Sequence, residues 1–515
     1  MDRFPTAETA ETEVAEELAA LRPGLVPLYE AHLGGARAAV LTRLWRALAF
    51  EPLPWITGRE HGRDGLVLRL ADGRRLQGPP ADPYATAAYV TAVSLDGTAY
   101  DDPARLTADL AVPHGGFLAA ELGHSVASLA LSRAGQPASA GTLPPMEEWP
   151  AEDWEWEQRV VDGHPFHPAC RSRPGFSVAE QLAYGPEHRP SVGLGLLPVR
   201  VSECLVRGVW PEDLRDGGRL LLPVHPWQAA HVLERRCEGG VLEARPLMSL
   251  RTLAVPGGPH VKTSLTARLT SSVRDISMGS IAASAALSAF GEDLAARSDG
   301  LLHITRTLGA AGAGSADLAA LWREPPQAYA GAGEHVLPVA ALPATGLPDS
   351  PSWLGDFTRL ALTVCLRLLE WGVALEAHGQ NLLVVLSRSG APLRLVYRDL
   401  ADIRVSPARL ARAGIPVPEL PARNVTDDPV ALRRKLFGSL VAGALAGTAG
   451  SWTALRAALE TAVRDLPRTP DLTALCAQPL PAKALTLMRL SPGTPGDQWT
   501  GLPNPLVLAP GASGQ

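Results

Sequence analysis

The sequence has little that would place the chain in a membrane, an exported compartment or a nucleic-acid complex. Its longest apolar tracts, such as 278–290 and 436–445, carry Ser and Gly and are too short to span a bilayer. The N-terminal residues 1–21 are acidic and helix-like, without the basic and apolar segments of an export signal. Lys and Arg number 47 against 53 Asp and Glu, giving a net charge of −6, and no long basic stripe occurs. We therefore expect a cytoplasmic protein without a membrane or nucleic-acid partner.

Cysteine is also scarce, and the motifs of nucleophilic catalysis are missing. The sequence has 5 cysteines, an odd number; they are far apart and form no CxxC pair, which suits a reducing compartment (Cys170, Cys204, Cys237, Cys365 and Cys476). No GxSxG elbow, recognisable cysteine-nucleophile motif, Gly-rich phosphate loop or internal repeat is present. The chemistry predicted from this sequence therefore needs no protein nucleophile.

The length of 515 residues exceeds what one ordinary core holds, so two or three structural units are expected. Gly and Pro number 49 and 47 and punctuate many segments, which indicates many short loops. The segments 135–145 and 331–352 are the richest loop stretches, and they divide the chain into 1–148, 149–345 and 346–515. Apolar spacing predicts helices near 8–50, 116–131, 278–294, 318–323, 356–375, 429–445 and 452–466.

The rest of the chain is organised around residues 376–402. Two apolar runs, 382–386 and 393–397, flank a turn-like segment that carries Gly and Pro, which predicts a β-hairpin. In such a hairpin Glu376, His378 and Asn381 converge with Asp399 at one end. Carboxylate and amide oxygens are what Mg²⁺ with a nucleotide phosphate requires. The alternative is a polar hairpin end without a ligand.

A second predicted hairpin joins 246–253 to 261–266 across the turn 255–259. Arg251 and Lys262 lie on strands otherwise suited to burial, with the hydroxyls of Ser249 and Thr252 nearby. Because buried cations need partners, a triphosphate is one interpretation. Two surface-facing charges on an edge hairpin are the other.

The Pro-rich segment 163–176 carries histidines and arginines. A rigid loop with His164, Arg171 and Arg173 would present donors to an anion. His164, His167 and Cys170 at intervals of three suggest zinc, but the intervening prolines forbid the helix that would stack such ligands. We favour the nucleotide-facing loop.

The segment 268–277 precedes the predicted apolar helix from Met278. Thr270 and Ser271 at a helix start would leave backbone N–H groups for an anion, and Arg274 would grip a carboxylate with two parallel bonds. Alternatively, Thr270 or Ser271 only caps the helix. His225, after the apolar run 219–224, is expected to be structural.

Taken in order, the blocks GHPFHPACRSRPGF, VHPWQ, SLRT, VKTSLTARLTSSVRDIS, EAHGQN, YRDL, LPAKALTLMRL and LPNPL resemble the motif series of the IucA/IucC family, the siderophore synthetases that work without peptide synthetase modules. The resemblance runs from about residue 150 to the C-terminus. It implies an α+β fold of several domains, shaped as a cupped hand of thumb, fingers and palm with antiparallel sheets and flanking helices. The units 1–148, 149–345 and 346–515 would be these three parts.

The resemblance also implies an activity. Such enzymes use Mg-ATP to adenylate a carboxylate, often citrate or a citrate or dicarboxylate derivative, and pass the acyl group to an amine or hydroxyl. Small-molecule substrates and a homodimer are therefore expected. The family's common Lys in the HPxHPxxK block is Arg171 here, which keeps the charge but changes its geometry.

Site residues follow from the resemblance position by position. ATP contacts are implied for His164, Ser249, Arg251, Thr252, Lys262 and Arg323. Magnesium ligands are implied for Glu376 and Asp399, and we add Asn381 from the hairpin geometry. Carboxylate contacts are implied for Thr270, Ser271, Arg274 and His378. Of these residues, Arg274, His378 and Lys262 are expected to act on the reacting groups, because cations can stabilise the charge that spreads over the phosphoryl oxygens.

Two other functions remain open from the sequence. A kinase-like phosphotransferase is suggested by His378-Gly379-Gln380-Asn381 followed by a hairpin and Asp399, but Gln380 stands where that class has its catalytic Asp. A non-enzymatic siderophore-binding protein is the other, and the missing export signal weighs against it. Pyrophosphate release separates the three.

Overall fold

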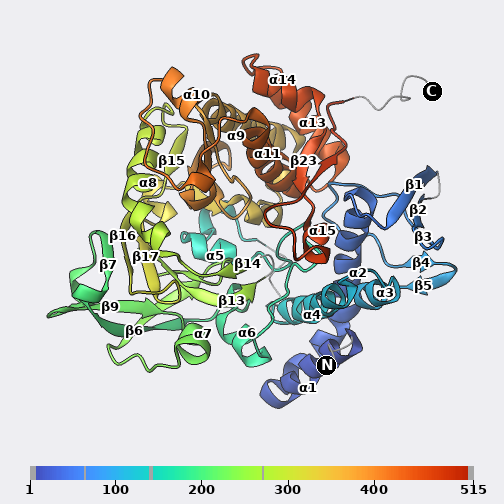
Figure 1. Cartoon of the computed structure of the whole chain (residues 1–515), viewed down its shortest axis with the longest axis horizontal. Helices are drawn as coiled ribbons and strands as arrows, with labels where there is room; N and C mark the ends of the chain where they lie inside the picture. The colour runs from blue at the N-terminus through green and yellow to red at the C-terminus, as the bar shows by residue number, and fades with distance from the viewer. Residues whose placement is uncertain (1–6, 63–64, 138–142, 270–271, 508–515) are drawn as a thin grey trace.

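The protein is an α+β molecule of several packed layers, seen in a computed structural model that describes residues 7–62, 65–137, 143–269 and 272–507. Helices and antiparallel sheets alternate along the chain, as the resemblance implies (Figure 1). The N-terminal part lies to one side, the long sheet of the middle part lies below, and the C-terminal half covers it from above. No helix among the described residues has the length and apolarity that crossing a bilayer requires.

The N-terminal part is a helical layer beside an antiparallel sheet. A break at Pro23 separates α1 (Ala7–Leu21) from α2 (Val26–Phe50), and α2 packs on α4 (Gly115–Ala134) and α3 (Pro103–Asp109). The sheet has the order β1-β2-β3-β4-β5 and comprises Ile56–Gly62, Gly65–Leu70, Arg75–Gly78, Val93–Leu95 and Thr98–Tyr100. Trp45, Tyr29 and Leu48 are buried in the core between these layers.

The middle part is built on a long antiparallel sheet with the order β7-β16-β17-β12-β11-β10-β6-β9-β8. A capping box opens the short helix α6 (Val178–Tyr184), where Ser177 caps the helix together with Glu180. The strands of the sheet are β6 (Val192–Arg200), β7 (Leu205–Gly208), β8 (Arg215–Asp216), β9 (Arg219–Val224), β10 (Val241–Pro246), β11 (Thr252–Ala254), β12 (His260–Thr263), β16 (Thr307–Gly312) and β17 (Ala319–Arg323).

Two sequence-based predictions in this part are wrong. The segment 318–323 was expected to be a short helix, but β17 is a strand whose Lys262-facing residue is Leu321. Its alanines favour a helix locally, yet β12 and β16 pair with it on both sides and bury it, so tertiary pairing decides. The helix α8 (Met278–Ala296) begins where expected, but Ser277 caps it. Residues 265–274 precede it as the strands β13 (Leu265–Leu269) and β14 (Ser272–Arg274) rather than as its first turn.

The C-terminal half packs a small sheet against a bundle of helices. The predicted hairpin is confirmed as β20 (Leu382–Leu386) and β21 (Pro392–Tyr397), with Leu382 opposite Tyr397. The neighbours of the hairpin are β18 (His335–Pro338) and β15 (Leu302–Ile304), the latter parallel to β21. The helices are α9 (Pro351–Trp371), α10 (Pro407–Arg412), α11 (Pro429–Ser439), α12 (Ala446–Ala449), α13 (Trp452–Val463) and α14 (Pro470–Ala477).

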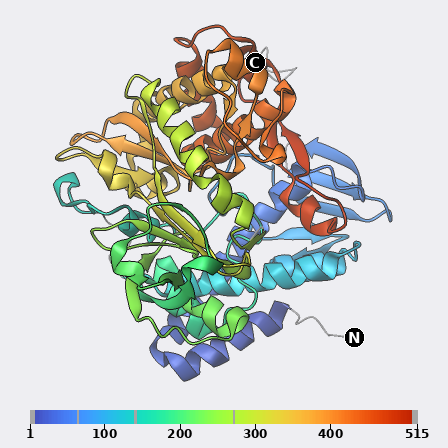
Figure 2. The same cartoon turned by 60° about the vertical axis from the view of Figure 1, so that its left-hand side comes forward.

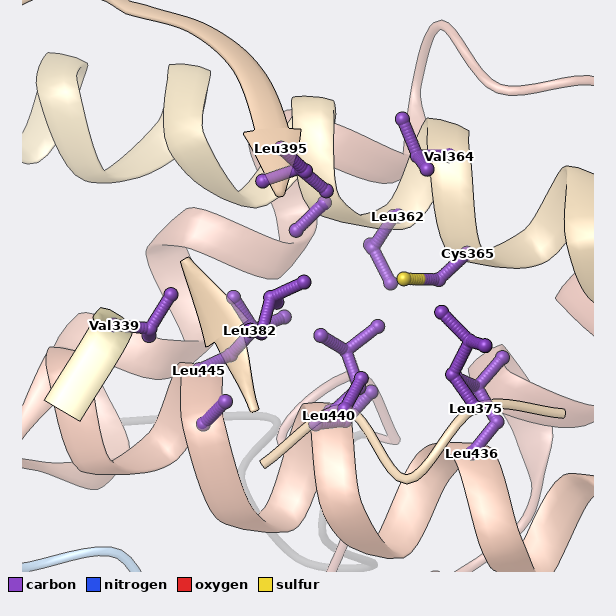
Figure 3. Packing of buried hydrophobic residues seen from close by; sticks show 14 of the residues in the cluster. Val339, Leu362, Val364, Cys365, Leu375, Leu382, Leu395, Leu436, Leu440 and Leu445 are labelled. Atoms are coloured by element: carbon purple, nitrogen blue, oxygen red, sulfur yellow. The ribbon is translucent and has the colours of Figure 1, made fainter. Parts of the chain in front are cut away.

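The hairpin is fixed from below by one apolar core. Leu382 and Leu395 point from the hairpin toward Leu362 and Cys365 of α9 and toward Leu440, which follows α11 (Figure 3). All of these side chains are fully buried. At roughly 1.5 to 3 kcal/mol for each large apolar side chain, this burial holds the end of the hairpin rigidly in place.

The C-terminal segment of the described chain packs against its N-terminal part. The strands β23 (Leu480–Lys483) and β24 (Trp499–Leu502) pair with each other, and the helix α15 (Leu485–Leu490) between them lies against α2 and α4. Figure 2 shows this red segment beside the blue N-terminal layer. Glu51 accepts bonds from the Thr486 and Leu487 N–H groups at 3.1 and 2.8 Å. The C-terminal segment therefore fastens the N-terminal part to the C-terminal half.

Candidate active site

One cleft lies between the long middle sheet and the β20–β21 hairpin. It encloses about 760 Å³ including the space at its mouth. Its lining combines residues from segments far apart in the sequence: Leu247, Ser249, Arg251, Thr252, His260, Lys262, Thr305, Arg323, Glu324, Pro326, Glu376, His378, Gln380, Asn381, Arg398, Asp399 and Asp402. Both predicted hairpins therefore contribute their polar residues to the same cavity.

The first wall of the cleft comes from the β11–β12 hairpin and the turn before it. Thr252 pairs with Lys262, which confirms the hairpin. The first strand was predicted too long, because Ser249 and Arg251 lie in the turn before β11. Leu250 has a left-handed backbone with φ of 63°, which a non-glycine residue adopts only under strain that its surroundings hold in place. This turn positions Ser249, whose Oγ accepts from the Thr252 N–H at 3.1 Å. Arg251 extends from the turn and donates to the Asp275 carbonyl at 2.7 Å.

Asp399 connects this wall to the hairpin. Lys262 Nζ lies 2.7 Å from Asp399 Oδ2, and Arg323 donates to Oδ1 at 3.1 Å. Burial lowers the pKa of Lys262 to about 7, against the opposing pull of Asp399. Although burial alone would raise it, the charges of Arg323 and Lys262 hold the pKa of Asp399 well below its usual range. The carboxylate is thus ionised and held between two cations.

The opposite side of the hairpin end holds Glu376. Its Oε1 lies 2.7 Å from Lys435 Nζ and 3.5 Å from Lys483 Nζ. Burial would raise the pKa of Glu376, but Lys435, His378 and Lys483 together lower it to about 2. The Asn381 N–H donates to the His378 carbonyl at 2.9 Å, which fixes the tight turn between them. Glu376, His378 and Asn381 therefore meet Asp399 at one cleft, as predicted.

A buried ionic network lies beneath the cleft, and sequence reasoning missed it. Arg398 Nη2 donates to Glu157 Oε1 at 2.5 Å, and Glu157 Oε2 accepts from the Met248 N–H at 2.7 Å. His260 Nε2 lies 3.2 Å from Asp153 Oδ1, within hydrogen-bond distance. Only Arg398, next to Asp399, had a signal in the sequence, because it belongs to the block YRDL. This network ties the hairpin end to the turn that positions Ser249.

The Pro-rich segment 163–176 differs from the nucleotide-facing loop that was predicted. His164 is exposed, and desolvation by its surroundings together with the nearby charges of His378, Arg43 and Arg46 lowers its pKa. It therefore stands close to His378, although it is not among the residues that line the cleft. Arg43 of α2 donates to the His164 carbonyl at 3.2 Å and so anchors the loop.

Arg171 and Arg173 pair with an internal carboxylate and do not face a ligand anion, so that prediction is wrong. Both side chains are buried and lie 3.4 and 2.8 Å from Glu187, whose side chain has no exposed surface. They neutralise an internal carboxylate because burial of an unpaired charge would be costly. His167 and Cys170 are buried as well: His167 Nδ1 accepts from the Ala169 N–H, and Cys170 Sγ lies 3.6 Å from Ser125 Oγ. Within the described ranges, no three His, Cys, Asp or Glu side chains gather as metal ligands.

The predicted carboxylate contacts are only partly visible. Thr270 and Ser271 lie outside the described residues, and of Arg274 only the backbone, in β14, is described. The helix-start argument for these three residues is wrong, because Ser277 caps α8. His378 lines the cleft as expected. His225 is buried, and its Nδ1 accepts from the Trp227 N–H at 3.2 Å, in the structural role expected for it.

The hairpin end fits a magnesium ion bound with a phosphate. Glu376 and Asp399 are ionised, and Asn381 donates through Nδ2 to the Glu376 carbonyl at 3.5 Å, which leaves its amide oxygen for another ligand. Hard oxygen donors of this kind are what Mg²⁺ prefers. Asp402 adds a further carboxylate to the same cleft. It lies inside the stretch 376–402, and its short spacing from Asp399 was the available signal.

Known families match the chain in two consecutive blocks. Residues 153–344 match the model described as the IucA / IucC family, and this block contributes Arg251, Lys262 and Arg323 to the cleft. Over residues 153–344 the chain is thus similar to the IucA / IucC family. Residues 351–494, with Glu376 and Asp399, match a model described as a ferric iron reductase FhuF-like transporter. The two walls of the cleft thus lie in segments that match two different family models.

The relatives of this chain are distant in sequence. The citryl-spermidine/3,4-dihydroxybenzoyl-citryl-spermidine:spermidine ligase of Bacillus anthracis is 25% identical over 313 residues, 48% of this chain and 51% of the relative. The chain thus spans about half the length of the curated relatives it matches. The fold is similar to petrobactin biosynthesis protein AsbB of Bacillus anthracis, with a TM-score of 0.76, 18% identity and coverage of 94% and 97% of the two chains. ATP-bound aerobactin synthetase IucA of Klebsiella pneumoniae has a TM-score of 0.70 at 18% identity, covering 92% of this chain and 99% of the other.

Proposed function

We propose that this protein is an ATP-dependent siderophore synthetase. It would adenylate citrate or a citrate or dicarboxylate derivative, then join the acyl group to an amine or hydroxyl, releasing AMP and pyrophosphate. The observation that carries the proposal is the cleft itself: Lys262 and Arg323 meet the Asp399 carboxylate beside Glu376 and His378. The names of the relatives support it, since one is a citryl-spermidine ligase and another is described as an ATP-bound synthetase.

In the first step, a carboxylate oxygen of the substrate attacks the α-phosphorus of ATP. A bond forms between this oxygen and the α-phosphorus. The bond from the α-phosphorus to the oxygen that bridges it to the β-phosphorus breaks, and pyrophosphate leaves. Arg251, Lys262 and Arg323 line one wall, where they would hold the triphosphate and stabilise the charge that develops on it. Ser249 and Thr252 add hydroxyl donors beside them.

Magnesium, held by Glu376, Asn381 and Asp399, would neutralise phosphate oxygens and orient the triphosphate. The side chains themselves keep the required geometry: the Lys435 and Lys483 ammonium groups hold Glu376, and Arg398 anchors the backbone beside Asp399 through Glu157. His378 would stand on the carboxylate side of the cleft.

In the second step, the nucleophile attacks the acyl carbon of the adenylate. The bond from that carbon to the AMP oxygen breaks, AMP leaves with the oxygen, and the attacking amine or hydroxyl loses a proton. No side chain becomes covalently attached, in keeping with a cleft built of cations, carboxylates and amides.

A kinase-like reaction fits the cleft less well. Gln380 lines the cleft at the place where the kinase pattern requires a carboxylate base. Its amide cannot accept a proton from a substrate hydroxyl at neutral pH. A siderophore-binding protein without enzymatic activity is also disfavoured. The two ionised carboxylates would have a role in binding a magnesium nucleotide.

The test is a screen of citrate and other dicarboxylates or tricarboxylates against polyamines, hydroxylated diamines and alcohols, with Mg-ATP. We expect pyrophosphate and AMP to form only when a matching carboxylate and nucleophile are both present. ADP together with a phosphorylated substrate would favour the kinase, and binding of a ferric siderophore without nucleotide turnover would favour the binder.

A further inference from the structure

Asp402 differs from the other carboxylates of the cleft. It lies at the end of the 3-10 turn Leu400–Asp402 and is exposed at the edge of the cavity. Glu376 pairs with two lysines, Asp399 with Lys262 and Arg323, and Glu324 with Arg306. In the part of the chain that the structure describes, the Asp402 carboxylate has no hydrogen-bond or ion-pair partner. It is an anion in the cleft without a cation.

The backbone around Asp402 is nevertheless held firmly. The buried Asn424 donates through Nδ2 to the Ala401 carbonyl at 3.0 Å and to the Ile403 carbonyl at 2.8 Å. Leu400 is buried against Gly291 of α8, where a Cβ would come within 2.9 Å of its side chain. These bonds on both sides of Asp402 fix its backbone position and leave its carboxylate unoccupied.

The position of Asp402 is on the Glu376 side of the cleft. Burial first, and then the negative charges of Glu376, Asp399 and Asp402, raise the pKa of the Tyr397 hydroxyl far above its usual range, so all three carboxylates lie near this phenol. Tyr397 donates to the Asp399 carbonyl at 3.3 Å. Asp402 is therefore close to the hairpin end where His378 lies and where the acyl group of the adenylate would be presented.

The charge of the unpaired Asp402 carboxylate can be compared with the charge of each substrate. A carboxylate and a triphosphate bring only negative charge, and the cations of the cleft match them. A diamine brings the opposite charge, because its unreacted amine stays protonated near neutral pH, with a pKa close to that of lysine. A neutral alcohol would gain nothing from an anion at this place. Charge complementarity thus favours a cationic nucleophile.

We propose that Asp402 binds the distal ammonium group of a diamine or polyamine nucleophile while its other amine attacks the acyl adenylate. This rests on the proposed function and names the class of its nucleophile. The attacking nitrogen, uncharged when it reacts, forms the C–N bond; the C–O bond to AMP breaks, AMP leaves, and the nitrogen proton passes to solvent. Asp402 takes no part in these bond changes and acts in binding and specificity.

The experiment compares Asp402→Asn with wild type in two assays. The first is exchange of labelled pyrophosphate into ATP, which depends on the carboxylate and needs no nucleophile. The second is steady-state turnover with 1,5-diaminopentane or spermidine as the cationic probe and with hydroxylamine as a small neutral probe. We expect Asp402→Asn to raise the KM of the cationic probes by about tenfold or more, with exchange and hydroxylamine turnover at wild-type rates.

Two further variants sharpen the comparison. Asp402→Glu keeps the charge and should restore most of the affinity for the diamine. Asp213→Asn removes an equal charge at an exposed position of the 3-10 turn Glu212–Leu214, outside the cleft, and should change nothing.

The outcomes separate the inference from the function on which it rests. Unchanged KM for both cationic probes in Asp402→Asn, with normal exchange in wild type, overturns the inference and leaves the function standing. Loss of exchange in Asp402→Asn with a raised Mg²⁺ requirement also overturns it, since Asp402 would then be a metal ligand. If wild type shows no carboxylate-dependent exchange at all, the proposed function fails, and the inference fails with it.

Discussion

The Lys262 ammonium lies 2.7 Å from the Asp399 carboxylate, and this contact joins strand β12 to the end of the β20–β21 hairpin. The two residues belong to blocks that match different family models. Arg323 contacts the second oxygen of Asp399 from the neighbouring strand. Two cations and one carboxylate are therefore preassembled as one group, which the proposed nucleotide and its metal would rearrange.

The first prediction concerns the two carboxylates of the hairpin end. Asp399→Asn and Glu376→Gln should each abolish turnover, because each removes one negative charge from the group that would hold magnesium. Asp399→Asn also leaves Lys262 and Arg323 without their shared anion. The measurement is the rate of pyrophosphate release at saturating Mg-ATP, beside circular dichroism to verify the fold. Near-normal turnover in either folded variant would contradict the assignment.

The second prediction separates the two sides of the site. Lys262→Ala should weaken ATP binding even without a carboxylate, because the ammonium lies with the phosphate-facing cations. Arg274→Ala should leave ATP binding nearly unchanged and raise the KM of the carboxylate by roughly ten- to a hundredfold, the loss of a charge-assisted contact of about 1.5 to 3 kcal/mol. Calorimetry of ATP binding and steady-state titration of the carboxylate measure the two effects. The division is wrong if Arg274→Ala loses ATP affinity as Lys262→Ala does while its carboxylate dependence stays normal.

The third prediction concerns the buried cluster of Arg171, Arg173 and Glu187. Glu187→Gln should lower the free energy of unfolding by about 3 to 5 kcal/mol, because it leaves two buried guanidinium groups without their anion. ATP affinity of the folded variant should stay at the wild-type value. Denaturant unfolding and ATP calorimetry test both statements. Loss of ATP affinity without loss of stability would show that Arg171 and Arg173 act in nucleotide binding.

The fourth prediction is a pH dependence of the contact between the two ends of the chain. Burial raises the pKa of Glu51 from 4.5 to about 7, against bonds from the Leu487 and Thr486 N–H groups. The folded state thus holds this proton more tightly than the unfolded state. Its stabilising effect is full below pH 4.5 and is lost as the pH rises through 7, a change of roughly 3 kcal/mol.

Thermal unfolding of wild type and Glu51→Gln at pH 5 and pH 8 measures this effect. Because Gln does not titrate, the variant should gain stability relative to wild type as the pH rises. A difference between the two proteins that is the same at both pH values would show that Glu51 keeps its ordinary pKa.

The sequence predicted the local elements of the site well and their surroundings less well. The hairpins around Lys262 and Asp399 follow from alternating apolar residues and turn residues, which are local signals. The strand around Arg323 was missed because its alanines favour a helix, and only pairing with β12 and β16 decides otherwise. Charge alone cannot tell a ligand-binding arginine from one that meets a buried carboxylate, so Arg171 was misplaced.

Residues that act through distant partners were the hardest to predict. Glu157 lies 241 positions from Arg398, and Lys435 and Lys483 reach Glu376 from other elements. No spacing within one segment encodes such contacts. The division at 148 and 345 and the homodimer stay predictions, which limited proteolysis and sedimentation analysis will test.

The central claim, that the carboxylate is activated as an acyl adenylate, is tested most directly with an oxygen-18 label in the carboxylate of the substrate. After turnover with Mg-ATP and an amine, mass spectrometry of the nucleotide and phosphate products locates the label. The account predicts AMP that carries one labelled oxygen, because the C–O bond of the adenylate breaks when the amine attacks. Label in inorganic phosphate with ADP as the nucleotide product, or no label in AMP, would contradict it.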